Sequence, residues 1–183
     1  MAPIKTKLIK LAWIGAQGSA KTTTVNRISR MLTDIGIPHR VVIEKARVCS
    51  LPLGTYKAQE WMVHEQIRDE QTMENQLRNT ILANTWPQVF ELCDRSIWDS
   101  LIYMTYMNRH GTATDSELHS IDSLINGYVS TMVPYNELYL CEPRTLYPDP
   151  KRPSDDEGKK YQLEIYDIFK EIIKERGLKA TIV

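Results

Sequence analysis

The chain has 183 residues, 42% hydrophobic and 25% charged, which is long enough for one domain with its own core. Its 23 basic residues balance its 23 acidic residues, so no overall positive charge favours nucleic acid or an anionic membrane as a partner. Three widely spaced cysteines without a C-x-x-C pair argue against a disulfide framework or a zinc site. No apolar run approaches about 18 residues, the length of a membrane span. The first residues lack a secretory signal, so we expect a cytoplasmic protein.

The first predicted element is a buried strand over residues 8–14, followed by Gly15-Ala-Gln-Gly-Ser-Ala-Lys-Thr22 and a helical pattern. This order matches the phosphate-binding loop, G-x-x-x-x-G-K-[ST], except that Ala20 replaces the last glycine. Backbone N–H groups of such a loop, and of the helix after it, point at nucleotide phosphates. Lys21 would add a positive charge near the β- and γ-phosphates, and the Thr22 hydroxyl would hold Mg²⁺.

Ala20 is the one departure from the motif. It stands where the helix opens, and alanine is a good helix former, so we expect the backbone to tolerate it. A glycine needed for a positive φ would not be replaced so easily. The nucleotide-binding residues predicted from the motif are Gly15, Ala16, Gln17, Gly18, Ser19, Ala20, Lys21, Thr22 and Thr23.

Short apolar strands alternate with helical patterns along the rest of the chain. Further strands are predicted over 39–44, 88–93, 136–141 and 178–183. Helical patterns cover 55–85 and 96–107, and capping boxes at 114–117 and 154–157 start two more helices. This alternation predicts one α/β domain over 1–183, a three-layer α/β/α P-loop fold with a parallel sheet of about five strands.

The segment 55–85 is rich in polar side chains, most of which we interpret as a solvated helix face. Local ion pairs are expected among Glu60, Glu65, Arg68, Asp69, Glu70 and Glu74. Its glutamines Gln59, Gln66 and Gln71 could read the edge of a base. A glutamine on an exposed helix usually contacts water, however, so they are left out of the predicted site.

Polar residues follow the second and third predicted strands. Ligands of parallel sheets bind beyond the carboxyl ends of the strands, so Glu44, Asp94 and Arg95 should converge on the phosphate-binding loop. A carboxylate there serves Mg²⁺ or accepts a proton from an attacking hydroxyl, and Asp94 joins Thr22 as a predicted metal residue. Arg95 suits a phosphate or the charge of a transition state, and Asp99 could orient it.

Residues 144–153 form a loop rich in proline and charge. A mobile loop with several cations can close over a triphosphate and exclude water, so we predict a lid here. Arg144 is assigned to nucleotide binding and Arg152 to catalysis.

Four segments occur in the order seen in small P-loop kinases: Gly15 to Thr23, Val42-Ile-Glu-Lys-Ala-Arg47, Cys93-Asp-Arg-Ser-Ile-Trp-Asp-Ser-Leu-Ile-Tyr103 and Tyr139-Leu-Cys-Glu-Pro143. The chain resembles nucleoside and nucleotide kinases, including thymidylate kinases, deoxynucleoside kinases and the nicotinamide riboside kinase domain. It is most similar to small AAA-domain ATP-binding proteins, many of them encoded by phages. The resemblance covers nearly the whole chain, although thymidylate kinases carry an aromatic residue where this chain has Ser96.

The resemblance implies a phosphotransferase of nucleotide metabolism that uses ATP and Mg²⁺. Its catalytic residues would be Lys21, Glu44, Asp94, Arg95 and Arg152. Glu44 or Asp94 would be the general base, and Arg95 would contact the acceptor hydroxyl or phosphate. Arg152 would be the lid arginine. We therefore expect phosphoryl transfer to a small nucleoside- or nucleotide-like acceptor.

Two alternatives stay open. One is an ATP-dependent switch or ATPase with a macromolecular partner, and the other is a kinase acting on modified nucleotides in nucleic acid, which the zero net charge disfavours. A homodimer is compatible with the sequence. The acceptor's base and sugar depend on residues 48–85 and on the loop near 110, which carry no motif for a particular substrate.

Overall fold

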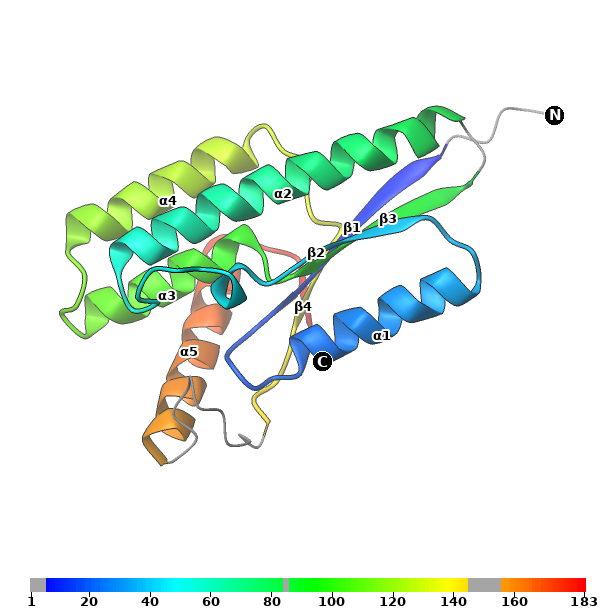
Figure 1. Cartoon of the computed structure of the whole chain (residues 1–183). Helices are drawn as coiled ribbons and strands as arrows, with labels where there is room; N and C mark the ends of the chain where they lie inside the picture. Colours follow the sequence, from blue (N-terminus) through cyan, green and yellow to red (C-terminus); the bar gives the residue numbers. More distant parts are fainter. Residues whose placement is uncertain (1–5, 84–85, 145–155) are drawn as a thin grey trace.

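All five strands of the central sheet run parallel, in the order β2-β3-β1-β4-β5 (Figure 1). The computed structural model describes residues 6–83, 86–144 and 156–183. The strands are β1 (Lys7–Ile14), β2 (His39–Val42), β3 (Gln88–Asp94), β4 (Glu137–Leu140) and β5 (Ala180–Ile182). The helices are α1 (Lys21–Asp34), the 3₁₀-helix η1 (Lys45–Arg47), α2 (Tyr56–Ala83), α3 (Ile97–Arg109), α4 (Asp115–Val129) and α5 (Asp156–Glu175).

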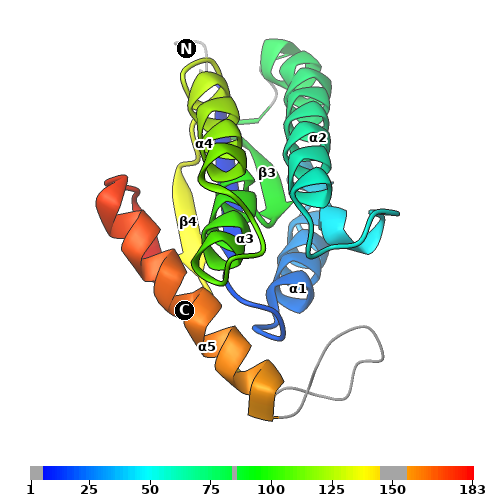
Figure 2. The ribbon, with the colours of Figure 1, turned by 90° about the vertical axis from the view of Figure 1, so that its left-hand side faces the viewer.

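Helices cover both faces of the sheet, which confirms the predicted three-layer α/β/α fold. Successive side chains of a strand point to opposite faces. Ala12 and Ile14 of β1 join a large core with α2, α3, α4 and α5, whereas Trp13 packs with Val25 of α1 in a smaller one. Figure 1 shows α1 and α2 on opposite sides of the sheet, and Figure 2 shows α3 between α2 and α5. Within the described residues, α2, α3, α4 and α5 therefore lie on one side of the sheet and α1 lies on the other.

The predicted elements are present with small shifts of their ends. The second strand ends at Val42 rather than residue 44, and 55–85 contains a single helix of 28 residues. The capping box at Thr114 is confirmed, and Ser96 forms another with Asp99. The first two residues of the box at 154–157 lie outside the described residues, and so does all of the predicted lid after Arg144. Within the described part of the chain, none of the helices is long and apolar enough to cross a bilayer.

The backbone at Ala20 departs from the expectation. Ala20 is the N-cap of α1 and has φ 59° and ψ 19°, in the left-handed region. The expected unstrained helix opening is therefore wrong. The phosphate-binding loop needs a positive φ here, which glycine adopts freely and which costs an L-residue about 1–2 kcal/mol.

A buried charged cluster joins α2 to the sheet. Lys10 Nζ of β1 lies 2.7 Å from Glu70 Oε2, 2.8 Å from Glu74 Oε1 and 4.0 Å from Glu91 Oε1. Lys10, Glu70 and Glu91 have no exposed side-chain surface. The expected solvated face is therefore wrong for Glu70 and Glu74, because a lysine in the buried row of β1 draws both carboxylates inward. The Tyr135 hydroxyl also donates to Glu70 Oε1 at 2.7 Å.

Burial raises the pKa of Glu91 to about 8, against the opposing effect of Lys10, so this carboxyl keeps its proton at neutral pH. Between about pH 4.5 and 8 the unfolded chain has lost this proton while the folded chain retains it. The free energy of unfolding should therefore fall as pH rises through this window, by up to about 1.4 kcal/mol per pH unit from this group. We expect Glu91→Gln to remove this part of the slope in urea unfolding measured at pH 5, 6, 7 and 8.

Glu175→Gln, a change at an exposed position of α5, is the matched control and should leave the slope as in the wild type. Parallel wild-type and Glu91→Gln curves would contradict a protonated Glu91. The other groups facing Glu91 are Lys10 of β1, Glu70 and Glu74 of α2, and Cys93 of β3, and they are common to both proteins.

Replacing Ala20 by glycine should relieve the left-handed backbone. Glycine also gains freedom in the unfolded chain, so we expect a net rise in the free energy of unfolding of about 0.5–1 kcal/mol. Ala83→Gly, at an exposed position in the last turn of α2, should instead lower it. Chemical denaturation at one pH compares the three proteins, and a less stable Ala20→Gly would contradict the strain.

Candidate functional site

The loop between β1 and α1 has the geometry of an anion cradle. Gly15 and Gly18 have φ 133° and 72°, and Ala20 is also left-handed. A Cβ on Gly15 would lie 2.8 Å from the carbonyl oxygen of Cys141, so no other residue fits against the end of β4. The loop leads directly into the N-terminus of α1, where unpaired backbone N–H groups favour negative charge.

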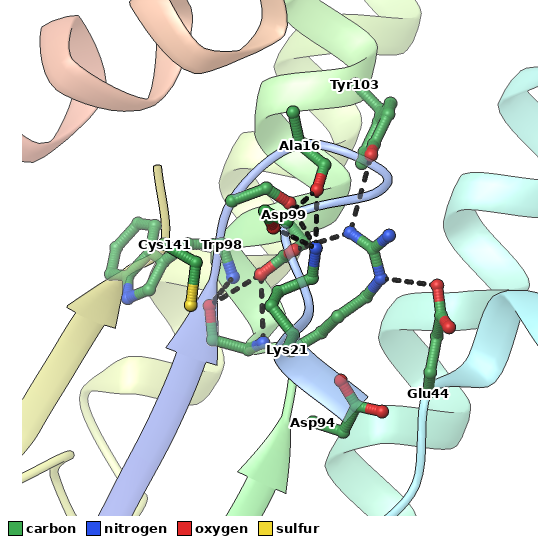
Figure 3. Close-up of polar contacts among 12 residues, drawn as sticks. Ala16, Lys21, Glu44, Asp94, Trp98, Asp99, Tyr103 and Cys141 are labelled. Carbon is green, nitrogen blue, oxygen red and sulfur yellow. Dashed lines mark hydrogen bonds and ion pairs between the residues drawn. The ribbon is translucent and has the colours of Figure 1, made fainter. Parts of the chain in front are cut away.

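Lys21 is turned into this loop (Figure 3). Its Nζ donates to the carbonyl oxygens of Gly15 (2.8 Å) and Ala16 (2.6 Å) and to Ser19 Oγ (3.0 Å). The residue is 5% exposed, and burial, reinforced by the nearby Arg95, lowers the pKa of Lys21 to about 7. An anion in the cradle would offset both effects, so the site is electrostatically suited to phosphate.

Thr22 and Asp94 form a pair of oxygen ligands beside the loop. The Thr22 hydroxyl donates to Asp94 Oδ2 at 2.6 Å, and Asp94 Oδ1 is buried without a hydrogen-bond partner among the described residues. Burial raises the pKa of Asp94, because its charge is only partly compensated. Oxygen donors of this kind suit Mg²⁺, which commonly takes one or two protein ligands and completes its shell with phosphate and water.

Arg95 holds two buried carboxylates at once. Its Nε donates to Glu44 Oε1 and its Nη1 to Asp99 Oδ1, each at 2.8 Å. Asp99 Oδ2 in turn accepts from the Ser96 backbone N–H at 2.9 Å, so the capping box of α3 fixes the carboxylate that orients Arg95. The predicted roles of Asp99 as a partner of Arg95, and of these strand ends as a meeting point, agree with this geometry.

The Arg95 backbone has φ 86°, which is rare for a residue with a long side chain. Its N–H donates to the carbonyl oxygen of Trp13 at 3.0 Å, and its carbonyl oxygen accepts from Gln66 Nε2 at 3.3 Å. These two bonds hold the backbone in a conformation that costs of order 1–3 kcal/mol. Such strain is concentrated at functional sites, where the surroundings keep it in place.

Arg47 closes the gap between the two groups of residues. Its Nε donates to Glu44 Oε2 at 2.8 Å and its Nη2 to Thr22 Oγ1 at 3.3 Å. A continuous chain of polar side chains therefore runs through Asp99, Arg95, Glu44, Arg47, Thr22 and Asp94. The sequence placed Arg47 in a matching segment but did not assign it to the site.

A cavity of about 470 Å³ opens beside Arg95. Its walls come from η1 and the segment after it, from α2, α3 and α5, and from the turn near Thr112. Of these, only the segment 48–85 and the loop near 110 were expected to determine the acceptor. Tyr103, Tyr106 and Tyr161 line it together with Met62 and Met107. Its size lies in the range of small-molecule sites, about 300–1,000 Å³.

Three glutamines line the cavity, and for two of them the expected contact with water is wrong. Gln59 and Gln66 are each 3% exposed and face the cavity from α2, whereas Gln71 is exposed as expected. The third is Gln17 of the loop, whose carbonyl oxygen accepts from Gln162 Nε2 of α5 at 2.7 Å. A spacing of seven residues between Gln59 and Gln66, two turns on one helix face, is the signal that could have placed both together.

The remaining predicted residues are less informative. Thr23 is exposed in the first turn of α1, and Arg144 is exposed with its carbonyl oxygen bonded to Gln162 Nε2 at 3.2 Å. Arg152 lies outside the described residues.

The fold is shared with several solved kinases, at low sequence identity. Deoxyadenosine kinase from M. mycoides with bound dATP aligns with a TM-score of 0.64 and 15% identity, over 96% of this chain and 90% of that one. Thymidylate kinase from Ehrlichia chaffeensis gives a TM-score of 0.61 and 15% identity, over 96% and 86%. The NadR protein in complex with NR gives 0.67 and 16%, over 95% of this chain but only 45% of that protein.

A search of curated proteins finds no match. A family model described as an AAA domain matches residues 10–183, which is nearly the whole chain. Its span runs from β1 to the last residue and includes the phosphate-binding loop, Glu44 after β2, Asp94 at the end of β3, and α5. The chain therefore belongs to this AAA-domain family and has the fold of P-loop nucleoside and nucleotide kinases.

Proposed function

We propose that the protein transfers the γ-phosphoryl group of ATP to a hydroxyl or phosphate of a small nucleoside- or nucleotide-like acceptor. The observation that carries this proposal is the chain of polar side chains from the cavity to the phosphate-binding loop. An acceptor bound in the cavity would lie next to the group to be transferred. The shared kinase fold supports the same class of reaction.

On the nucleotide side, the backbone N–H groups of residues 15–20 and the N-terminus of α1 would hold the phosphates. The Lys21 ammonium would exchange its bonds to the loop carbonyl oxygens for bonds to the β- and γ-phosphates. These anions would raise the pKa of Lys21 again and keep it protonated. Thr22 and Asp94 would hold Mg²⁺, which when bound neutralises charge on the phosphate oxygens. Arg144 would contact the nucleotide. Arg152, outside the described residues, keeps its predicted role as the arginine of the 144–153 lid.

On the acceptor side, Glu44 is the better general base. It is bonded to the cavity-lining Arg95, whereas Asp94 accepts from Thr22 on the nucleotide side. As the acceptor oxygen bonds to the γ-phosphorus, its proton passes to Glu44, and the bond from phosphorus to the bridging oxygen breaks to release ADP. Arg95 keeps the carboxylate in place and stabilises charge on the transferred group.

Lys21→Ala should strongly reduce transfer. We expect kcat/KM to fall about 10²-fold or more, because a positive charge on the transferred group's oxygens is lost. The assay follows label from γ-labelled ATP and Mg²⁺ onto a panel of nucleosides, nucleotides and single-stranded DNA.

Lys57→Ala, which removes an exposed lysine of α2, is the control and should match the wild type. Label in free phosphate alone would contradict the proposal and favour an ATPase switch. Label on the DNA alone would favour a kinase acting on nucleic acid.

Removing the charge of Glu44 and removing that of Asp94 should change different kinetic quantities. Glu44→Gln should lower kcat about 10²-fold or more, with little change in the Mg²⁺ concentration that gives half-maximal activity. Asp94→Asn should raise that concentration, because a metal ligand loses its charge. Titrating Mg²⁺ at saturating ATP compares them, and the reverse pattern would exchange the two assignments.

A further inference from the structure

We infer that the acceptor is an uncharged nucleoside, which presents a hydroxyl to Glu44 and a ring or amino N–H to Gln59. This inference rests on the proposed function and chooses between the two acceptor classes that the function leaves open. It follows from the charges around the cavity, from one unsatisfied amide oxygen and from the cavity's aromatic wall.

The cations that line the cavity are already neutralised. Arg95 is bonded to both Glu44 and Asp99, and these three side chains are at most 10% exposed. Lys45, the other described cation in the lining, is paired with Asp69. An acceptor phosphate near Arg95 would lie beside two buried carboxylates, and the described lining residues would offer it no unpaired positive charge in exchange for its hydration.

A hydroxyl suits the same place. It is neutral, so no charge is desolvated when it enters the cavity. It can donate to Glu44, a carboxylate that the bonds from Arg95 and Arg47 hold in a fixed orientation. The arrangement that repels a phosphate therefore orients a hydroxyl for attack.

Gln59 of α2 supplies another polar group in the cavity wall. Its Nε2 donates to the carbonyl oxygen of Leu53 at 3.0 Å, which fixes the orientation of the amide. Its Oε1 is then a buried acceptor with no hydrogen-bond partner in the part of the chain that is described. A buried acceptor without a donor is costly, so a ligand N–H at this position would be favourable.

The wall of the cavity matches a flat ring. Tyr106 and Tyr161 meet edge to face with their ring centroids 4.7 Å apart, and Tyr103 lies under the Arg95 guanidinium at 5.4 Å. Met62 and Met107 add adaptable apolar surface to the lining. A planar heterocycle with a sugar hydroxyl combines these features in one molecule.

The experiment compares each nucleoside with its own 5′-monophosphate as acceptor of label from γ-labelled ATP. We expect the preferred nucleoside to have a kcat/KM at least tenfold above that of its monophosphate. A preference for the monophosphate would overturn the inference while leaving the proposed function intact. No label on any small acceptor would contradict the proposed function itself, and this inference with it.

Gln59→Met tests the amide contact. We expect the KM for the preferred nucleoside to rise about tenfold while the KM for ATP is unchanged, because one hydrogen bond to the ring is lost. Gln71→Met, on the same helix but exposed, should change neither. An unchanged nucleoside KM in Gln59→Met would overturn the role of Gln59.

If Gln59→Met does not fold, Gln59→Glu is the second variant, because it keeps an acceptor oxygen at this position. We expect it to phosphorylate nucleosides that carry a ring N–H in preference to those that lack one. Loss of this preference would equally overturn the role of Gln59.

Discussion

The bonds of Arg95 to Glu44 and Asp99 determine how the site is built. They join the segment between β3 and α3 to the turn after β2, which lies 51 residues earlier in the sequence, so one guanidinium fixes both parts of the site. Arg95 also adopts a left-handed backbone, held by the carbonyl oxygen of Trp13 and the amide of Gln66. Replacing Arg95 would remove this guanidinium from both buried carboxylates, so the three residues act as a unit.

Most of the fold could be predicted from the sequence, because its signals are local. The phosphate-binding loop, the apolar strands and the capping box at Thr114 each depend on neighbours within a few residues. The convergence of Glu44, Asp94 and Arg95 followed from a rule of topology, that parallel strands end at the same edge. Nothing local distinguishes Glu44 from Asp94, and only their partners in space suggest different roles.

The residues that could not be predicted depend on contacts between distant segments. Glu70 and Glu74 have the spacing of a solvated face, and only Lys10, some sixty residues away, explains their burial. Gln59 and Gln66 were misassigned for the same reason, since composition does not reveal which face of α2 meets the cavity. Ala20 could not be predicted for a different reason. Helix propensity favours alanine, but the turn before the helix determines the backbone angles of Ala20.

The uneven layers of the fold bear on how the site opens. Four helices share the large core, whereas α1 buries fully only Lys21 and Val25, with Ile28 and Leu32 partly buried against the sheet. Local unfolding starts where few apolar contacts hold an element. Detachment of α1 would dismantle the phosphate cradle and leave the acceptor cavity standing. A nucleotide bound to both the loop and α1 would therefore stabilise α1 against local unfolding. Its binding would raise the protection of α1 amides against hydrogen exchange more than it raises the protection of α3 amides.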